Sequence, residues 1–190
     1  MRIGVLALQG AFIEHERRVA EFGAVPFEIR ERRDIDAPFD GLVLPGGEST
    51  VQGKLLRELG LFAPLRDRIA AGLPVLGTCA GLILLAKAIK DDPSVHFGVL
   101  DVTVERNAYG RQLGSFHAEA PLAGGPAIPL TFIRAPKITA YGPAVEPLVV
   151  LDGTPVAVRQ GNLVAAAFHP ELDADPALHA LFLETVRTSR

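Results

Sequence analysis

The single cysteine of this chain, Cys79, lies at the centre of a G-x-C-x-G turn. The apolar run 73–76 precedes the turn and the apolar run 82–86 follows it, which predicts a strand, a sharp bend and a helix. Gly77 and Gly81 allow the bend without a Cβ clash, so the thiol should project above the helix N-terminus, where a thiolate could act as a nucleophile. A lone cysteine is more often a core residue, and the two glycines favour the chemical interpretation.

A base for this nucleophile is available where a second apolar stretch, 164–168, ends in His169, Pro170 and Glu171. In extended backbone, residues i and i+2 lie on the same side, and Pro170 biases His169 away from helix. Glu171 could therefore bind one imidazole nitrogen while the other faces the thiol, as in a Cys-His-Glu triad. A polar strand end packed by chance is the alternative. The remaining histidines are interpreted as solvated or structural residues: His15, His96, His117 and His179.

A third candidate element is the double glycine Gly46 and Gly47, which ends a short apolar strand. Such a turn exposes backbone N–H groups that could hold a phosphate or an oxyanion. The phosphate-loop interpretation is discarded, because Leu55 stands where a magnesium-binding Ser or Thr is required. Ser49 is expected to be the N-cap of a helix over 50–59 and therefore a structural residue. Gly47 is expected to take part in the chemistry through the glycine turn.

These three motifs, in this order and spacing, resemble those of the class I glutamine amidotransferases, glutaminase modules that release ammonia for a partner synthase. The motifs are PGGES at 45–49, GTCAG at 77–81 and FHPE at 168–171. Further stretches are similar to the glutaminase subunits of pyridoxal 5'-phosphate synthase within that family, and the resemblance covers essentially the whole chain. These stretches are 3–11, 104–116 and 132–136.

The resemblance implies roles for individual positions. Cys79 would be the nucleophile, with His169 and Glu171 as its relay partners. The oxyanion and substrate contacts for L-glutamine would come from Gly46, Gly47, Glu48, Ala80, Arg106, Ile133 and Arg134. A guanidinium can pair with the α-carboxylate of an amino acid, and an acceptor such as Glu48 can bind its ammonium group. Without the resemblance, Arg106 and Arg134 would be interpreted as solvated strand charges.

The expected reaction is hydrolysis of the side-chain amide of L-glutamine through a γ-glutamyl thioester on Cys79. The resemblance also implies docking on a pyridoxal 5'-phosphate synthase subunit that receives the ammonia. A further hypothesis is that the partner aligns the Gly46–Gly47 peptide as an oxyanion donor. The alternatives are a glutaminase subunit of another amidotransferase, a Cys peptidase-like hydrolase of the same superfamily and a non-catalytic binding subunit.

The composition is ordinary for a soluble α/β protein, with 48% hydrophobic and 22% charged residues among 190. A formal net charge of -3 gives no case for nucleic acid, and the sequence shows no metal-ligand cluster and indicates no cofactor. No apolar run reaches the roughly 18 residues of a membrane span. We therefore expect a single glutaminase domain over 1–190 in the reducing cytoplasm, without nucleic-acid or membrane partners.

Hydrophobic periodicity alternates between strands and helices before residue 93 and indicates mainly strands after it. The expected helices are 11–22, 50–59, 62–71, 80–89 and about 175–187. The expected strands are 2–8, 25–30, 41–44, 74–78, 99–105, 115–120, 129–134, 138–141, 146–151, 155–160 and 163–168.

This pattern predicts a three-layer α/β fold: an open, mostly parallel sheet with flanking helices and added antiparallel strands. All three motifs follow strands. They should therefore meet at the carboxyl edge of the sheet, where open α/β sheets bind ligands. In the first helix, Phe12 and Ile13 could face the partner or the core, and we expect them in the core.

Overall fold

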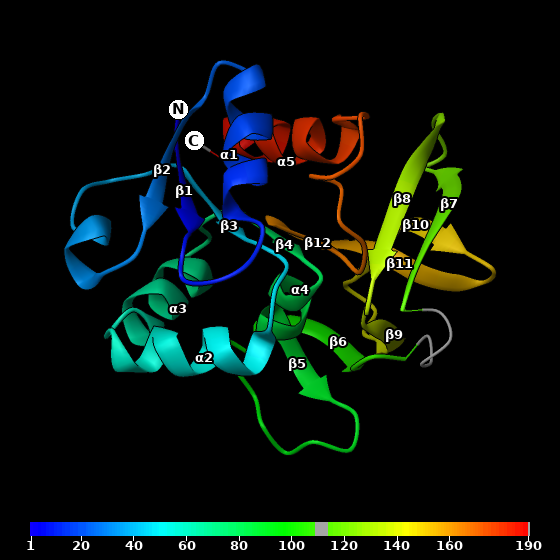
Figure 1. The fold of residues 1–190 in the computed structure, drawn as a ribbon, viewed down its shortest axis with the longest axis horizontal. Helices are drawn as coiled ribbons and strands as arrows, with labels where there is room; N and C mark the ends of the chain where they lie inside the picture. Colours follow the sequence, from blue (N-terminus) through cyan, green and yellow to red (C-terminus); the bar gives the residue numbers. More distant parts are fainter. Residues whose placement is uncertain (109–113, 190) are drawn as a thin grey trace.

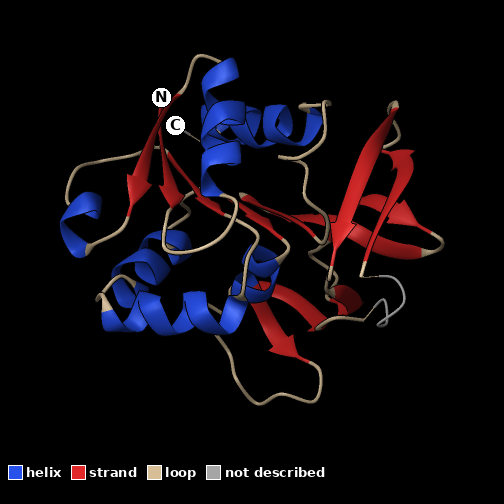
Figure 2. Ribbon diagram, viewed as in Figure 1, coloured by secondary structure: helices blue, strands red, loops and turns tan. Residues whose placement is uncertain are grey.

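The computed structural model describes residues 1–108 and 114–189 (Figures 1 and 2). Its helices are α1 (Phe12–Glu21), α2 (Ser49–Glu58), α3 (Phe62–Ala70), α4 (Ala80–Leu85) and α5 (Ala177–Thr188), with a short 3-10 helix η1 (Arg32–Ile35). Its strands are β1 (Arg2–Leu6), β2 (Val25–Ile29), β3 (Gly41–Leu44), β4 (Val75–Thr78), β5 (Ala86–Ile89), β6 (Leu100–Glu105), β7 (Ser115–Pro121), β8 (Ala127–Ile133), β9 (Lys137–Tyr141), β10 (Glu146–Leu151), β11 (Thr154–Gln160) and β12 (Leu163–Ala166).

The described residues form a seven-stranded central sheet in the order β10-β11-β12-β4-β3-β1-β2. The strands from β12 to β2 are parallel, whereas β10 and β11 extend the same sheet in antiparallel pairing. Strands β3, β4 and β12 are buried along their whole length, because parallel strands at the centre of a sheet are covered on both faces. This sheet confirms the predicted mostly parallel architecture with added antiparallel strands.

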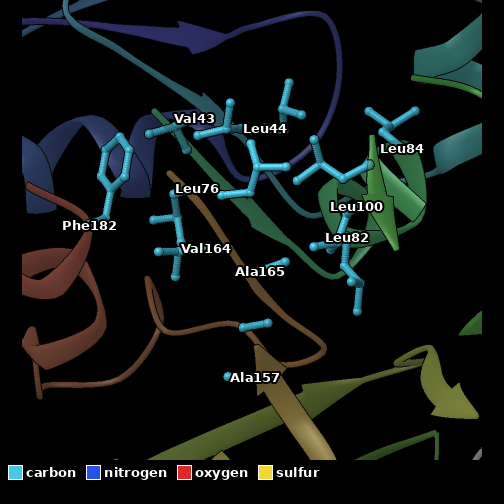
Figure 3. Packing of buried hydrophobic residues seen from close by; sticks show 14 of the residues in the cluster. Val43, Leu44, Leu76, Leu82, Leu84, Leu100, Ala157, Val164, Ala165 and Phe182 are labelled. Atoms are coloured by element: carbon cyan, nitrogen blue, oxygen red, sulfur yellow. The ribbon is translucent and has the colours of Figure 1, made fainter. Parts of the chain in front are cut away.

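Helices cover both faces of the central sheet and complete three layers. Helices α1 and α5 lie together on one face, and α2, α3 and α4 lie on the other (Figure 1). Buried side chains of the sheet and of both helical layers pack between them, among them Leu76, Leu82 and Phe182 (Figure 3). The core therefore lies directly behind the strand ends that carry the three motifs.

Some of the later strands form small sheets outside the central one. Strands β5, β6 and β9 make one sheet, and β7 and β8 make an antiparallel pair. The expected helix over 80–89 is wrong beyond Leu85, because the backbone becomes extended at Ala86 (φ -56°, ψ 140°) and 86–89 pairs with β6. A short apolar run fits a buried helix or a strand equally well, and residues 86–89 form a strand because β6 is available to pair with them.

The start of α2 also differs from the expectation. The helix begins at Ser49 itself, and its N-cap is Glu48, whose carboxylate accepts a hydrogen bond from the Val51 N–H at 3.2 Å. Ser49 is instead a buried residue of the first turn. The side chain of Glu48 is therefore engaged by its own helix.

The expectation that Ile13 lies in the core is wrong. Its side chain is 46% exposed, because the buried face of α1 follows His15 and Val19 one turn apart. Phe12 is partly buried and packs against the core. The buried face of α1 thus carries a histidine.

Candidate active site

Cys79 lies at the bend between β4 and α4, with backbone angles of φ 48° and ψ -101°. Non-glycine residues rarely take a positive φ, so the bend is strained at the cysteine itself. The flanking glycines are required for close packing and not for the bend itself. A Cβ on Gly81 would lie 2.0 Å from Leu44 O, and a Cβ on Gly77 would lie 2.9 Å from the Gly81 carbonyl carbon. The close approach of α4 to the strands therefore requires glycine, and that packing presents Cys79.

His169 follows β12, the parallel neighbour of β4 in the central sheet. The Cys79 N–H donates to Ala166 O at 2.8 Å, so strand pairing places the bend beside the histidine. His169 Nδ1 lies 2.7 Å from Oε1 of Glu171, and both side chains are buried. The hydrogen bond predicted between residues i and i+2 is present, and it leaves Nε2 as the ring nitrogen available to Cys79.

The protonation of this pair follows from its contacts. Burial favours the neutral imidazole, but hydrogen bonds with Cys79 and Glu171 outweigh it and raise the pKa of His169 to about 10. Burial likewise opposes ionisation of Glu171, yet the neighbouring His15 and the His169 hydrogen bond hold its pKa below the ordinary value. The pair is therefore an imidazolium and a carboxylate at neutral pH. An imidazolium can donate a proton to a leaving group.

The glycine turn packs directly against this pair. A Cβ on Gly46 would lie 2.3 Å from His169 Cε1, and a Cβ on Gly47 would lie 2.4 Å from Gln9 Oε1. Gly10, with φ 102°, approaches the same turn so closely that its Cβ would lie 1.8 Å from Gly46 O. Each of these glycines leaves space that a neighbouring group of the site occupies.

Hydrogen bonds hold Gly46 through both of its backbone polar groups. The Ala11 N–H donates to Gly46 O at 3.1 Å, and the Gly46 N–H donates to Thr78 Oγ1 at 3.1 Å. Because a trans peptide directs its C=O and N–H oppositely, the Gly47 N–H points away from Ala11. A second candidate donor is the N–H of Ala80, since amides in the first turn of a helix lack an intrahelical acceptor.

A cavity of about 320 Å³ opens at this point, within the size range of small-molecule sites. The predicted site residues that line it are Gly46, Gly47, Glu48, Cys79, Arg106, Ile133, Arg134 and His169. Two predicted residues do not line it: Glu171 lies behind His169, and Ala80 is fully buried. The structure thus brings most of the predicted residues to one opening.

Sequence reasoning missed part of the cavity wall, and Gln9 is the clearest case. Its Oε1 accepts a hydrogen bond from the Glu48 N–H at 2.7 Å, and its carbonyl accepts one from Gln52 Nε2 at 2.9 Å. A signal was available, because Gln9 stands between the first strand and a glycine, at the same sheet edge as the other motifs. The other unpredicted lining residues are Gly10, Ala11, Ser49, Ile83, Asn107 and Leu172.

The two predicted arginines reach the cavity from outside the central sheet. Arg106 Nη1 lies 3.1 Å from Asp92 Oδ2, which orients the guanidinium, and the Arg106 Nε is buried without a hydrogen-bond partner among the described residues. Arg134 is exposed at φ 44°, and its N–H donates to Gly114 O at 2.6 Å. Of the predicted stretch 104–116, positions 109–113 lie outside the described residues.

Of the two interpretations given for His15 and His179, solvated or structural, the structure supports the structural one. Both are fully buried, on α1 and α5 respectively, and His15 Nε2 lies 3.3 Å from Oε2 of Glu171. His117 is exposed and His96 is half-buried. Two histidines from distant parts of the sequence therefore lie directly behind the candidate triad.

Over residues 1–108 and 114–189, no group of three or more His, Cys, Asp or Glu side chains is arranged to hold a metal ion. No helix in the same described ranges has the length and apolar character needed to cross a membrane.

The motifs and the geometry agree with comparisons to known proteins. The model of the SNO glutamine amidotransferase family matches residues 5–188. The chain belongs to the SNO glutamine amidotransferase family. This membership confirms the amidotransferase resemblance found in the sequence.

Relatives within the SNO glutamine amidotransferase family align over nearly the whole chain. Two are named pyridoxal 5'-phosphate synthase subunit PdxT. The one from Methanocorpusculum labreanum is 57% identical over 98% of each chain, and the one from Desulfitobacterium hafniense is 53% identical over 98% of this chain and 94% of its own. A crystal structure of a glutamine amidotransferase matches with a TM-score of 0.92 at 45% identity, covering 97% of this chain and 98% of that one. This likeness confirms the predicted fold.

Proposed function

We propose that this chain hydrolyses the side-chain amide of L-glutamine and passes the ammonia to a pyridoxal 5'-phosphate synthase subunit, with 1–190 acting as one glutaminase domain. The observation that carries the proposal is the convergence of a strained, cavity-lining Cys79 with the His169–Glu171 pair. The partner is supported by the subunit name of the relatives, which align along almost their full length. A reduced cytoplasmic setting suits a working thiolate.

Cys79 is the nucleophile of the proposed reaction. Its thiolate attacks the carboxamide carbon, and the imidazolium of His169 gives its Nε2 proton to the nitrogen, so that ammonia leaves and a γ-glutamyl thioester remains. The neutral imidazole then takes a proton from water as the resulting hydroxide attacks the thioester. Collapse of the second tetrahedral intermediate releases glutamate and restores the thiolate. Glu171 holds the Nδ1–H throughout and stabilises each imidazolium.

The cavity wall supplies groups for the rest of the glutamine molecule. The amides of Gly47 and Ala80 would bind the oxyanion, and losing one such donor typically costs roughly 3 to 4 kcal/mol of barrier. Arg106 and Arg134 would pair with the α-carboxylate, whereas the carboxylate of Glu48 would accept from the α-ammonium.

The carbonyl of Ile133 faces the reacting atoms. Its oxygen lies 3.9 Å from Cys79 Sγ, so this carbonyl marks the position that the substrate occupies next to the thiol. It is a second acceptor for the ammonium group of glutamine.

Glutamate release from L-glutamine tests the proposal, measured on the chain alone and with its synthase partner, beside Cys79→Ala. Turnover that requires Cys79 is the expected result. Absence of glutamine turnover in both states would refute the proposal and direct attention to a peptidase-like hydrolase or a binding subunit. Turnover without transfer of ammonia to the synthase would instead point to another amidotransferase.

The same assay tests whether the partner aligns the Gly46–Gly47 peptide. The carbonyl of this peptide already accepts a hydrogen bond from the Ala11 N–H, so realignment would require exchanging that bond. We expect the partner to raise kcat, because an oxyanion donor contributes only when it is aligned. A free chain as fast as the complex would contradict this mechanism.

A further inference from the structure

The two carboxylate oxygens of Glu171 face different histidines, and only one of these histidines belongs to the triad. Oε1 is hydrogen-bonded to His169 Nδ1 at 2.7 Å, whereas Oε2 is buried without a hydrogen-bond partner among the described residues and faces His15 Nε2 on α1 at 3.3 Å. His15 Nε2 is also 3.0 Å from Thr78 Oγ1, and His15 Nδ1 is 2.9 Å from His179 Nε2 on α5. The four groups behind His169 come from α1, β4, α5 and the turn after β12, and all are buried.

One orphan atom settles which nitrogens carry hydrogen. His179 Nδ1 is buried and has no hydrogen-bond partner among the described residues. A buried N–H without an acceptor is costlier and rarer than an unpaired acceptor, so Nδ1 is the unprotonated nitrogen and Nε2 carries the hydrogen. The His179 Nε2–H therefore donates to His15 Nδ1. This bond in turn places the hydrogen of neutral His15 on Nε2, facing Glu171.

The opposite arrangement is unfavourable at both ends. A hydrogen on His15 Nδ1 would bury an unpaired N–H on His179. The Nε2 lone pair could then accept from Thr78 Oγ1, but it would also face the carboxylate at 3.3 Å. Burial also lowers the pKa of His15, and it lowers that of His179 to about 3, so both rings are neutral near neutral pH. The ring hydrogens therefore point in one direction, from His179 to His15 and from His15 toward Oε2 of Glu171.

We propose that His15 is a positioning residue of the glutaminase: its Nε2–H holds the second oxygen of Glu171, so that the first oxygen stays aimed at His169. His179 acts one step further back by fixing the tautomer of His15. This inference rests on the proposed function for its role in turnover. Neither histidine touches the cavity.

The same contact reaches the glycine turn. Thr78 Oγ1, which lies beside His15 Nε2, accepts the hydrogen bond from the Gly46 N–H at 3.1 Å. His15 therefore lies next to the carboxylate that orients the base and, through Thr78, is connected to the glycine turn. A displaced His15 would disturb both halves of the machinery.

A matched pair of amide variants tests the role of His15. The side-chain nitrogen of His15→Gln can take the place of Nε2, whereas that of His15→Asn reaches only the place of Nδ1. We expect His15→Gln to keep kcat within about threefold and His15→Asn to lose roughly 10- to 100-fold, as for a lost hydrogen bond to a charged group. The KM for glutamine should stay within about twofold in both. Val19→Ala, a buried change on the same helix, controls for destabilisation and should leave kcat unchanged.

Alkylation of Cys79 by iodoacetamide provides a readout that does not depend on glutamine. The rate should fall in His15→Asn and recover in His15→Gln, because a misaligned Glu171 weakens the imidazolium beside the thiolate. Equal kcat and equal alkylation rates in the Asn and Gln variants, both close to wild type, would overturn the inference. If the wild type turned over no glutamine, the proposed function would fail, and the alkylation rates would still decide the role of His15.

Discussion

The two sides of the candidate catalytic histidine are held in opposite ways. Behind His169, between α1 and α5, the side chains of Glu171, His15 and His179 are buried and contact one another. In front of it, Arg106 and Arg134 line an open cavity from chain outside the central sheet. The buried side fixes the reacting groups, and the open side can adjust to a substrate. Substitutions behind His169 should therefore change kcat, and substitutions in front of it should change KM.

His169→Ala should give the largest effect. It removes the proton donor and the partner of the thiolate, so we expect kcat for glutamine hydrolysis to fall by roughly 10⁴-fold or more. Glutamate release by the complex measures it. The double variant with Cys79→Ala should be no slower than Cys79→Ala alone, because the two residues act as a unit. A loss below tenfold would remove His169 from the mechanism.

Gly46→Ala should come next, as a change at the boundary between the two sides. The added Cβ would lie 2.3 Å from His169 Cε1, so the ring or the turn has to move. A displacement of about 1 Å in an active site can cost about 10²-fold, and we expect that loss in kcat. The measurement is steady-state kinetics with a check of the thermal unfolding midpoint. Unchanged kcat would mean that the turn yields without disturbing the base.

Arg106→Gln should give a smaller effect, and mainly in KM. The guanidinium would pair with the substrate carboxylate and is oriented by Asp92, so its loss should lower kcat/KM by roughly 10- to 100-fold. Because this contact is made before and during the reaction alike, kcat should change little. Glutamine titration of the assembled enzyme separates the two parameters. A fall confined to kcat would contradict the expectation that substitutions in front of His169 change mainly KM.

Among these substitutions, one at His179 should have the smallest effect on turnover. Its main effect should be on the pH dependence of stability. Burial, with His15 nearby, lowers its pKa to about 3, against an ordinary value of 6.5, so the unfolded chain binds the extra proton between these limits. The free energy of unfolding should therefore fall on acidification from pH 6.5, by up to about 1.4 kcal/mol per pH unit from this group. Urea unfolding at several pH values measures the slope, which should be shallower in His179→Phe. Equal slopes would contradict the buried neutral state.

The groups that were predictable from the sequence are those defined by short spacing. Cys79 between two glycines and Glu171 two residues after His169 are local patterns, and the structure places both as the patterns indicate. The end of α4 was not predictable, because Ala86 becomes extended only where β6 offers a pairing partner. Competition between two local structures is settled by contacts that periodicity does not contain.

The histidine contacts escaped prediction for a related reason. His15 and His179 are 164 positions apart in the sequence and meet only because α1 and α5 pack on the same face of the sheet. His15 stands between two glutamates, which indicates solvent rather than burial, whereas His179 stands between Leu178 and Ala180, and neither pattern indicates that the two rings meet. The buried side of the site is thus a product of the tertiary fold, whereas each of the three motifs at the strand ends can be recognised from a few consecutive residues.

The pairing of β4 with β12 determines at which stage of unfolding Cys79 and His169 separate. The Cys79 amide is hydrogen-bonded to Ala166 O at 2.8 Å, inside the buried centre of the sheet. An amide in such a position exchanges with deuterium mainly through global unfolding. Nucleophile and base would therefore stay together in every partly opened form that keeps these two strands paired, and heat or denaturant should abolish their encounter only when the whole sheet comes apart.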